Sequence, residues 1–138
     1  MAHWLLKSEP SSWSWEQQVA AGAGGTFWSG VRNTSANNNL RAMKRGELGF
    51  FYHSNVGKEI VGIVEVIKEH YPDPTDPTGK FGMVDVKAVE ALPHPVTLGH
   101  VKTEPKLKDM ALVKYARLSV QPVTDAEWRI VRRLGGLT

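Results

Sequence analysis

Two neighbouring runs of β-branched and aromatic residues constrain the fold of this chain most strongly. The first run is ELGFFYHS at 47–54, the second is EIVGIVEVIKEHY at 59–71, and only NVGK separates them. Such residues favour extended backbone, and a short connection that contains Asn and Gly is typical of a turn between antiparallel strands. The pattern therefore predicts a β-hairpin.

Other segments extend this pattern in both directions. Three more strands are predicted, at 3–9, 81–92 and 116–123. Three helices are predicted as well, at 14–22, 35–46 and 124–136. The first and last of these helices begin with a capping box, in which Ser or Thr is followed three residues later by Gln or Glu. Because strands outnumber helices and mostly follow one another, we predict an α+β fold: a small, mixed, mostly antiparallel β-barrel or curved sheet surrounded by short helices.

The length and composition limit the class of protein. The 138 residues are 41% hydrophobic and 22% charged, which is ordinary for one soluble globular domain spanning 1–138. The absence of cysteine excludes disulfides, thiolate metal sites and cysteine nucleophiles. The sequence contains neither a secretion signal nor an apolar run near the roughly 20 residues of a membrane-spanning helix. We expect a soluble protein with no membrane partner, cytoplasmic if it is bacterial, and a monomer.

The positive charge is unevenly distributed along the chain. The net charge is +3. Residues 28–58 contain five basic residues against one acidic residue, whereas 59–90 contain seven acidic residues against three lysines. Basic residues lead again over 102–133. A basic face suits contact with a polyanion such as nucleic acid, although small domains also carry excess lysine for solubility.

Patterns that would indicate catalysis are mostly missing. The five histidines are never spaced two or four residues apart, so without cysteine no metal site is expected, and no cofactor is expected either. There is no nucleophile elbow, Walker loop or dinucleotide-binding glycine run. Asp73 and Asp76 lie among prolines, where they suit turns better than acid–base chemistry. Lys7 and Glu9 could serve acid–base chemistry, but a charge pair at the end of a strand explains them better.

Aromatic residues next to polar ones indicate another kind of site. Trp28 follows a glycine-rich stretch and heads a long run of small, uncharged polar residues. The first strand of the hairpin ends with Tyr52, His53 and Ser54, and Phe81 opens the next predicted strand. An aromatic surface edged by polar groups is what an unpaired or flipped base requires, since the rings stack and the polar groups read the base edge. A tryptophan beside a glycine loop is also commonly a lid over the core, and these residues alone leave both interpretations open.

Seven short motifs carry a resemblance to a known family. In this sequence they read WLLKSEP, FWSGVRN, NNLRAMKRGE, FFYHSN, YPDPT, MVDV and RLSVQPVT. Their order and spacing resemble those of EVE-domain proteins, the family of the thymocyte nuclear proteins and their small bacterial relatives. The resemblance implies a PUA-like fold, and the EVE domain is similar to the YTH domain, which holds a methylated base in an aromatic cage. It therefore implies a non-catalytic reader of modified bases, such as methylated or oxidised cytosine in DNA, or a modified base in RNA.

The resemblance also implies roles for single residues. Trp28 matches the cage tryptophan of the family. Lys7 and Ser8 match the pair that ends the first strand and lines the pocket. Phe81 stands where the family usually has a tryptophan, and Asn37 replaces an arginine. Trp28 and Phe81 are expected to converge on one cavity.

These observations lead to one hypothesis for the site and leave two alternatives for the function. The expected base-binding pocket comprises Lys7, Ser8, Glu9, Trp28, Ser29, Val31, Arg32, Asn33, Tyr52, His53, Ser54 and Phe81. Arg32 is expected either to hold its loop by a salt bridge, with Glu9 as a candidate partner, or to reach a phosphate. One alternative is a hydrolase of modified nucleosides, as in the related ASCH domains, with Lys7 and Glu9 as candidates. The other is a protein-interaction module that uses the loop at 71–79 and the basic faces.

Overall fold

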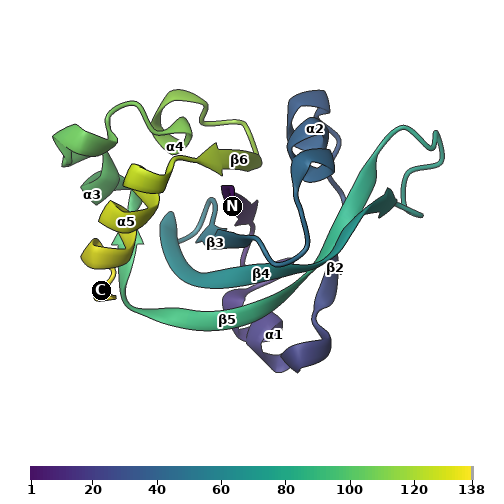
Figure 1. Cartoon of the computed structure of the whole chain (residues 1–138), viewed down its shortest axis with the longest axis horizontal. Helices are drawn as coiled ribbons and strands as arrows, with labels where there is room; N and C mark the ends of the chain where they lie inside the picture. The colour runs from purple at the N-terminus through teal and green to yellow at the C-terminus, as the bar shows by residue number, and fades with distance from the viewer. Residues whose placement is uncertain (138) are drawn as a thin grey trace.

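One strongly curved sheet forms the centre of the molecule. The computed structural model describes residues 1–137, and Figure 1 shows the sheet with helices around it. The six strands lie in the order β2-β5-β4-β3-β1-β6. Their bounds are β1 His3–Ser8, β2 Thr26–Trp28, β3 Leu48–His53, β4 Glu59–Pro72, β5 Gly82–Thr97 and β6 Val120–Val123. Strands β1 and β3 pair in parallel, and the other neighbours are antiparallel, so the expected α+β fold with a mixed, mostly antiparallel sheet is confirmed.

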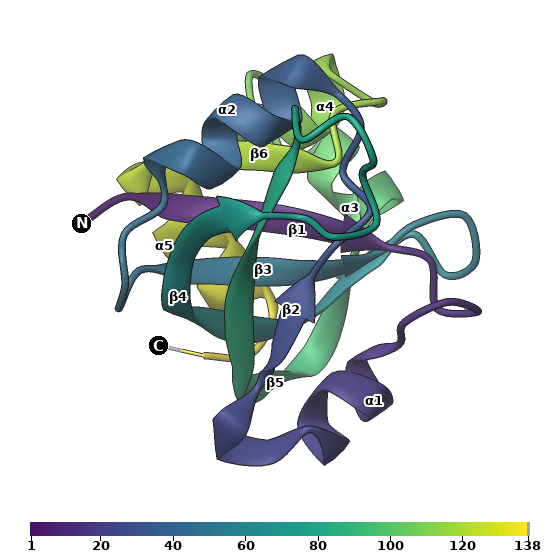
Figure 2. The ribbon, with the colours of Figure 1, turned by 90° about the vertical axis from the view of Figure 1, so that its right-hand side faces the viewer.

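The predicted hairpin consists of β3 and β4, and it begins the curvature of the sheet. Asn55 in its turn has a φ of 63°, a left-handed value that Asn tolerates better than most residues. The pairing of β3 with β4 shifts register once, and the pairing of β4 with β5 shifts at four points. Each shift is an irregularity of the bulge type, which bends a strand and increases its twist. The long strands therefore curl, and the sheet forms an open half-barrel (Figures 1 and 2).

Short helices surround the sheet. The α-helices are α1 Trp15–Ala20, α2 Thr34–Ala42, α3 Leu98–Thr103, α4 Ala111–Lys114 and α5 Asp125–Leu134. Two 3₁₀ helices, η1 Gly22–Gly24 and η2 Pro105–Leu107, complete the set within residues 1–137. Both predicted capping boxes are present, with Ser14 at the start of α1 and Thr124 at the start of α5. The sequence therefore marks these helix starts correctly.

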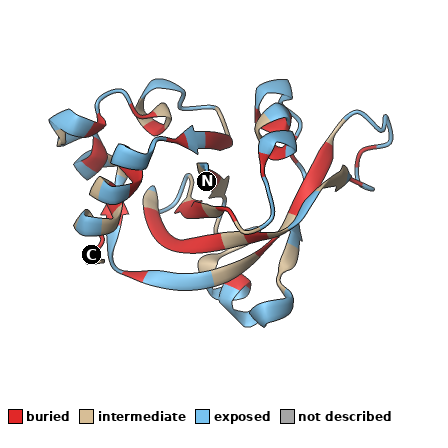
Figure 3. Cartoon of the chain, viewed as in Figure 1, coloured by how far each residue is buried: buried red, intermediate tan, exposed pale blue. Residues whose placement is uncertain are grey.

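Apolar side chains are buried on both faces of the sheet. The inner cluster, inside the half-barrel, includes Leu6, Trp28, Val31, Leu40 and Phe51. The outer cluster, under α3 to α5, includes Leu5, Phe50, Tyr52, Trp128 and Val131. Successive residues of a strand point to opposite faces, which is why neighbours in β1 and in β3 belong to different clusters. Figure 3 shows the buried residues concentrated along the central strands and on the sides of the helices that face them.

Candidate functional site

A cavity of about 390 Å³ lies where the C-terminal end of β1 faces β2. Its lining consists of Lys7, Ser8, Glu9, Ser12, Trp13, Thr26, Phe27, Trp28 and Ser29. Three strands separate β1 from β2 in the sheet, and the curl of the half-barrel brings them back toward each other (Figure 2). The volume lies within the range of small-ligand sites. Five of the predicted site residues therefore meet in one cavity.

Trp28 forms a wall of this cavity and also belongs to the core. Its side chain is only 7% exposed, and its ring packs edge to face against Phe51 with 5.4 Å between the ring centroids. The strand β2 holds it in register with Val84 of β5. Trp28 therefore packs in the core and lines the cavity at the same time.

Trp13 is a second indole in the cavity, and it is not among the predicted site residues. Its Nε1 donates a hydrogen bond of 2.9 Å to Oε1 of Gln18, whose side chain is fully buried. The Nε2 of Gln18 donates in turn to the carbonyl oxygen of Val86 on β5, at 3.2 Å. Ser8 Oγ also donates to the Trp13 carbonyl oxygen at 2.6 Å. Gln18 of α1, which is itself bonded to β5, therefore fixes this indole before any ligand arrives. The sequence did contain one indication of this position, because Trp13 directly precedes Ser14, the capping residue of α1.

His53 supports α1 and does not line the cavity, which corrects its predicted place. Its Nε2 accepts a hydrogen bond of 3.0 Å from the backbone N–H of Trp15, at the start of α1. Burial lowers the pKa of His53, although Glu59 and Glu16 oppose this effect. A neutral imidazole is what an accepting Nε2 requires. Close packing also positions α1, because a Cβ at Gly62 would come within 2.4 Å of the Trp15 ring.

Tyr52 and Ser54 are also absent from the cavity lining. Tyr52 is 3% exposed in the outer cluster, on the opposite face of the sheet from Trp28, and burial raises its pKa. Ser54 uses its backbone N–H to bond the carbonyl oxygen of Ser8 at 2.9 Å. Strand alternation explains the difference, since Tyr52 sits between two residues that point inward.

Lys7 and Glu9 border the cavity, but each charged group is engaged elsewhere. The Lys7 ammonium donates to the carbonyl oxygen of Ala116 at 2.7 Å and lies 5.8 Å from the ring centroid of Tyr52. Burial lowers the pKa of Lys7. Glu9 Oε1 accepts a hydrogen bond of 2.8 Å from Asn55 Nδ2. The charge pair expected between Lys7 and Glu9 is therefore not formed.

Arg32 holds the loop that follows Trp28, and its partner is Asp73, not Glu9. Arg32 Nη1 lies 3.2 Å from Asp73 Oδ2, and its Nη2 donates to Thr75 Oγ1 at 2.8 Å. The backbone N–H of Gly30 donates to the same Asp73 oxygen at 2.8 Å. Burial alone would raise the pKa of Asp73, but hydrogen bonds from Thr75, Gly30 and Arg32 lower it to about 2. The structural role expected for Arg32 is thus observed, and the proline-rich loop supplies the carboxylate.

Phe81 is not among the residues that line this cavity, so the expected convergence of Phe81 and Trp28 on it is not observed. The Phe81 ring lies near the Arg32 guanidinium, 5.9 Å from its centroid. The reason is the fold of the proline-rich loop: Asp76 Oδ2 accepts from the backbone N–H of Phe81 at 2.7 Å and of Lys80 at 2.9 Å. These bonds turn the chain back on itself before β5 begins.

Val31 and Asn33 likewise have structural roles outside the cavity. Val31 is 5% exposed and belongs to the inner cluster. Asn33 caps α2, because its Oδ1 accepts from the backbone N–H of Ala36 at 2.9 Å. Asn37, which stands in place of an arginine, is also structural, since its Oδ1 accepts from the Gly82 N–H at 3.0 Å.

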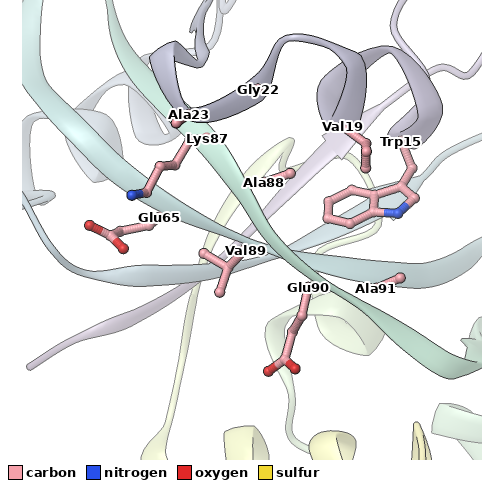
Figure 4. Close-up of a pocket in the computed structure, with 10 residues that line it drawn as sticks. All are labelled: Trp15, Val19, Gly22, Ala23, Glu65, Lys87, Ala88, Val89, Glu90 and Ala91. Atoms are coloured by element: carbon pink, nitrogen blue, oxygen red, sulfur yellow. The ribbon is translucent and has the colours of Figure 1, made fainter.

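A second, larger cavity of about 590 Å³ lies between α1 and the outer edge of β5. Figure 4 shows Trp15 and Val19 on one side of it and the β5 side chains from Lys87 to Ala91 on the other. It contains one indole and none of the predicted site residues. Across residues 1–137, no group of three or more acidic or histidine side chains could hold a metal ion, and no helix is long and apolar enough to cross a membrane.

Comparison with known proteins places the chain among close relatives. The EVE domain family model matches residues 2–134. Thymocyte nuclear protein 1 of Gallus gallus is 42% identical, in an alignment that covers 96% of this chain and 68% of that protein. An NMR structure from Rhodopseudomonas palustris is 63% identical with a TM-score of 0.93, covering 99% of this chain and 94% of the other. The crystal structure of human THYN1 in complex with 5-methylcytosine-containing DNA is 37% identical with a TM-score of 0.92, covering 100% of this chain and 99% of the other.

The expected likeness to YTH domains is also present, at the level of the fold. The YTH domain of Zygosaccharomyces rouxii MRB1, solved with N6-methyladenosine RNA, has a TM-score of 0.58 at 18% identity, covering 99% of this chain and 85% of the other. The family match spans nearly the whole chain, and the solved relatives share its curved sheet. This protein therefore belongs to the EVE domain family.

Proposed function

We propose that this protein is a non-catalytic reader that holds one modified base of a nucleic acid in the cavity between β1 and β2. The observation that carries the proposal is the pair of fixed indoles, Trp13 and Trp28, in the lining of one small cavity. Aromatic faces bind a base by stacking, and each stack contributes about 1–3 kcal/mol. Human THYN1, which is 37% identical, has been solved with DNA that contains 5-methylcytosine, and this supports the same class of ligand here.

The polar lining suits the edge of a base. Ser12, Thr26 and Ser29 bring hydroxyl groups to the cavity, and a hydroxyl can both donate and accept a hydrogen bond. Ser8 is already committed to the Trp13 carbonyl oxygen, so it shapes the cavity from behind. A base that enters would thus meet rings on its faces and adaptable hydroxyls at its edge, the arrangement used to recognise flipped or unpaired bases.

The engagement of Lys7 and Glu9 favours binding over catalysis. A general acid or base must reach the reacting group within hydrogen-bonding distance. The Lys7 ammonium is 2.7 Å from a backbone oxygen, and the Glu9 carboxylate is 2.8 Å from Asn55 Nδ2. Both groups have structural partners, and neither contacts the other. We therefore propose that the protein binds its ligand and releases it chemically unchanged.

A binding series tests this proposal. Short DNA and RNA oligonucleotides that differ only at one cytosine (unmodified, methylated at C5, or oxidised) should bind with different affinities, and the methylated or oxidised forms should bind best. The Trp13→Ala variant should weaken binding of the preferred oligonucleotide roughly five- to a hundredfold, because one stack is lost.

The Phe81→Ala variant is the matched control, since Phe81 is a partly exposed ring outside the cavity. It should bind like the parent protein. Equal affinity for all oligonucleotides would contradict the proposal, as would a Phe81→Ala loss as large as that of Trp13→Ala. A new product in the mass spectrum of the recovered ligand would indicate the hydrolase instead.

A further inference from the structure

We propose that the segment from Tyr115 to Ser119 forms a phosphate subsite beside the cavity, with the Arg117 guanidinium as its cation. Its ligand would be the phosphodiester next to the base held in the cavity. This inference rests on the proposed function and adds to it a place where the nucleic-acid backbone is held.

The position of the segment is fixed by the strand that borders the cavity. The Lys7 ammonium donates to the Ala116 carbonyl oxygen at 2.7 Å, and the Lys7 backbone N–H donates to the Ser119 carbonyl oxygen at 2.9 Å. Two bonds from one cavity residue thus hold both sides of Arg117. Figure 2 shows β6, which the segment leads into, lying alongside β1. A nucleotide whose base is in the cavity would have its backbone at this rim.

The charge of the segment suits a phosphate. From Ala111 to Thr124 the chain carries Lys114 and Arg117 and no acidic residue. Lys114 is paired with Asp109 at 3.4 Å. Arg117 is exposed, and within residues 1–137 its guanidinium has neither an ion pair nor a hydrogen-bond partner. A free guanidinium can bind a phosphate through two parallel hydrogen bonds.

One acidic residue, Glu9, follows directly after β1, and its carboxylate is held by a neutral side chain. Glu9 borders the cavity, and its carboxylate accepts a hydrogen bond from Asn55. The Lys7 ammonium is half-buried against Tyr52 and committed to Ala116, so Lys7 is a positioning residue for the segment. Arg117 is then the cation that remains available for the ligand.

A charge-matched pair of variants tests the subsite. Arg117→Gln removes the proposed cation, and Arg133→Gln removes an exposed arginine of α5, which packs on the outer cluster, away from Trp28. Each is compared with the parent for two probes: a short single-stranded DNA containing one 5-methylcytosine, and the nucleoside 5-methyl-2′-deoxycytidine.

We expect Arg117→Gln to bind the oligonucleotide about three- to fivefold more weakly at low salt. The slope of log K against log salt should become shallower by about 0.7, the value for one single-strand phosphate contact. Nucleoside binding, followed by NMR titration, should match that of the parent, because the cavity is intact. Arg133→Gln should change none of these quantities. Thermal melts confirm that both variants are folded.

The outcomes separate the subsite from the proposed function. If the parent protein prefers the methylated oligonucleotide but Arg117→Gln keeps the salt slope of the parent, the phosphate subsite is overturned and the proposed function stands. An equal loss for the nucleoside also overturns it, since the cavity would then be damaged. A parent that binds methylated and unmodified oligonucleotides equally overturns base reading, while an Arg117-dependent slope would still support the phosphate contact. No binding to either oligonucleotide overturns both.

Discussion

The buried carboxylate of Asp73 offers the sharpest test of how the loop after Trp28 is held. Its two oxygens accept four hydrogen bonds: from Gly30 N–H at 2.8 Å, from Arg32 Nη1 at 3.2 Å, and from the N–H and hydroxyl of Thr75 at 2.8 and 2.6 Å. In Asp73→Asn, an amide NH₂ replaces one oxygen and faces two of these donors. Each hydrogen bond to a charged group contributes about 1.5–3 kcal/mol, and water recovers part of this at the exposed side of Arg32. We expect a loss of about 3 kcal/mol in the free energy of unfolding.

The pH dependence gives the same prediction an independent readout. The pKa of Asp73 is about 2 in the folded protein, below its ordinary value of 3.8. A lowered folded pKa stabilises the protein above the unfolded pKa, and this contribution is lost as the pH falls from about 4 through 2. The parent should therefore lose more stability than Asp73→Asn over that interval. Thermal melts at pH 7, 4, 3 and 2 measure both effects, and at pH 7 the variant should melt roughly 10 °C lower.

The Asp109→Asn variant is the control, because Asp109 forms an ion pair of 3.4 Å with Lys114 and its side chain is 69% exposed. An exposed pair of this kind contributes about 0–1 kcal/mol. Equal melting temperatures of Asp73→Asn and the parent at pH 7 would show that the Asp73 carboxylate does not stabilise the fold. Identical losses of parent and variant between pH 4 and pH 2 would show the same.

Two further predictions follow from the packing around the cavity. Trp28→Ala should cost about 3–5 kcal/mol of stability as well as ligand affinity, because the ring is 7% exposed and packs on Phe51, and a parent-like melting temperature would show that the ring is not part of the core. Protonation of His53 removes the acceptor for the Trp15 N–H. Since the folded pKa of His53 is lowered, its contribution to stability is present above about pH 6.5 and is lost as the pH falls through the folded pKa. Tryptophan fluorescence followed as the pH is lowered from 7 should show this step, and the step should be missing in His53→Gln.

Much of the fold could be predicted because local sequence patterns determine it. The hairpin at 47–71 and the capping boxes at Ser14 and Thr124 use signals that lie within a few residues of one another. The strand β2, Thr26–Trp28, is not among the predicted strands. A stretch of three residues is too short to show the alternation that indicates a strand. The strand β2 forms because it pairs with Val84 to Val86 of β5.

The candidate site could be predicted around the ends of β1 and β2, and not at the end of β3 or in the proline-rich loop. Lys7, Ser8 and Trp28 meet at one cavity, as the motifs imply. The position of Phe81 depends on the hydrogen bonds of Asp76, which set the direction of the proline-rich loop. A pattern of hydrophobic residues in the sequence does not predict such bonds. Trp13 was missed because a side chain between a strand and a helix has no period to mark its direction. The buried Gln18 that holds its indole lies on the next element of the chain.

The proposed base pocket can be tested by titrating the protein with a single-stranded DNA that contains one 5-methylcytosine and following the tryptophan indole N–H signals by NMR. The signals of Trp13 and Trp28 should shift strongly, because both indoles line the cavity. The signal of Trp128 should stay in place, since that ring is buried in the outer cluster. The same DNA with unmodified cytosine should shift the two cavity signals much less. Unmoved Trp13 and Trp28 signals at saturation with the methylated DNA, or identical shifts with both DNAs, would contradict the account.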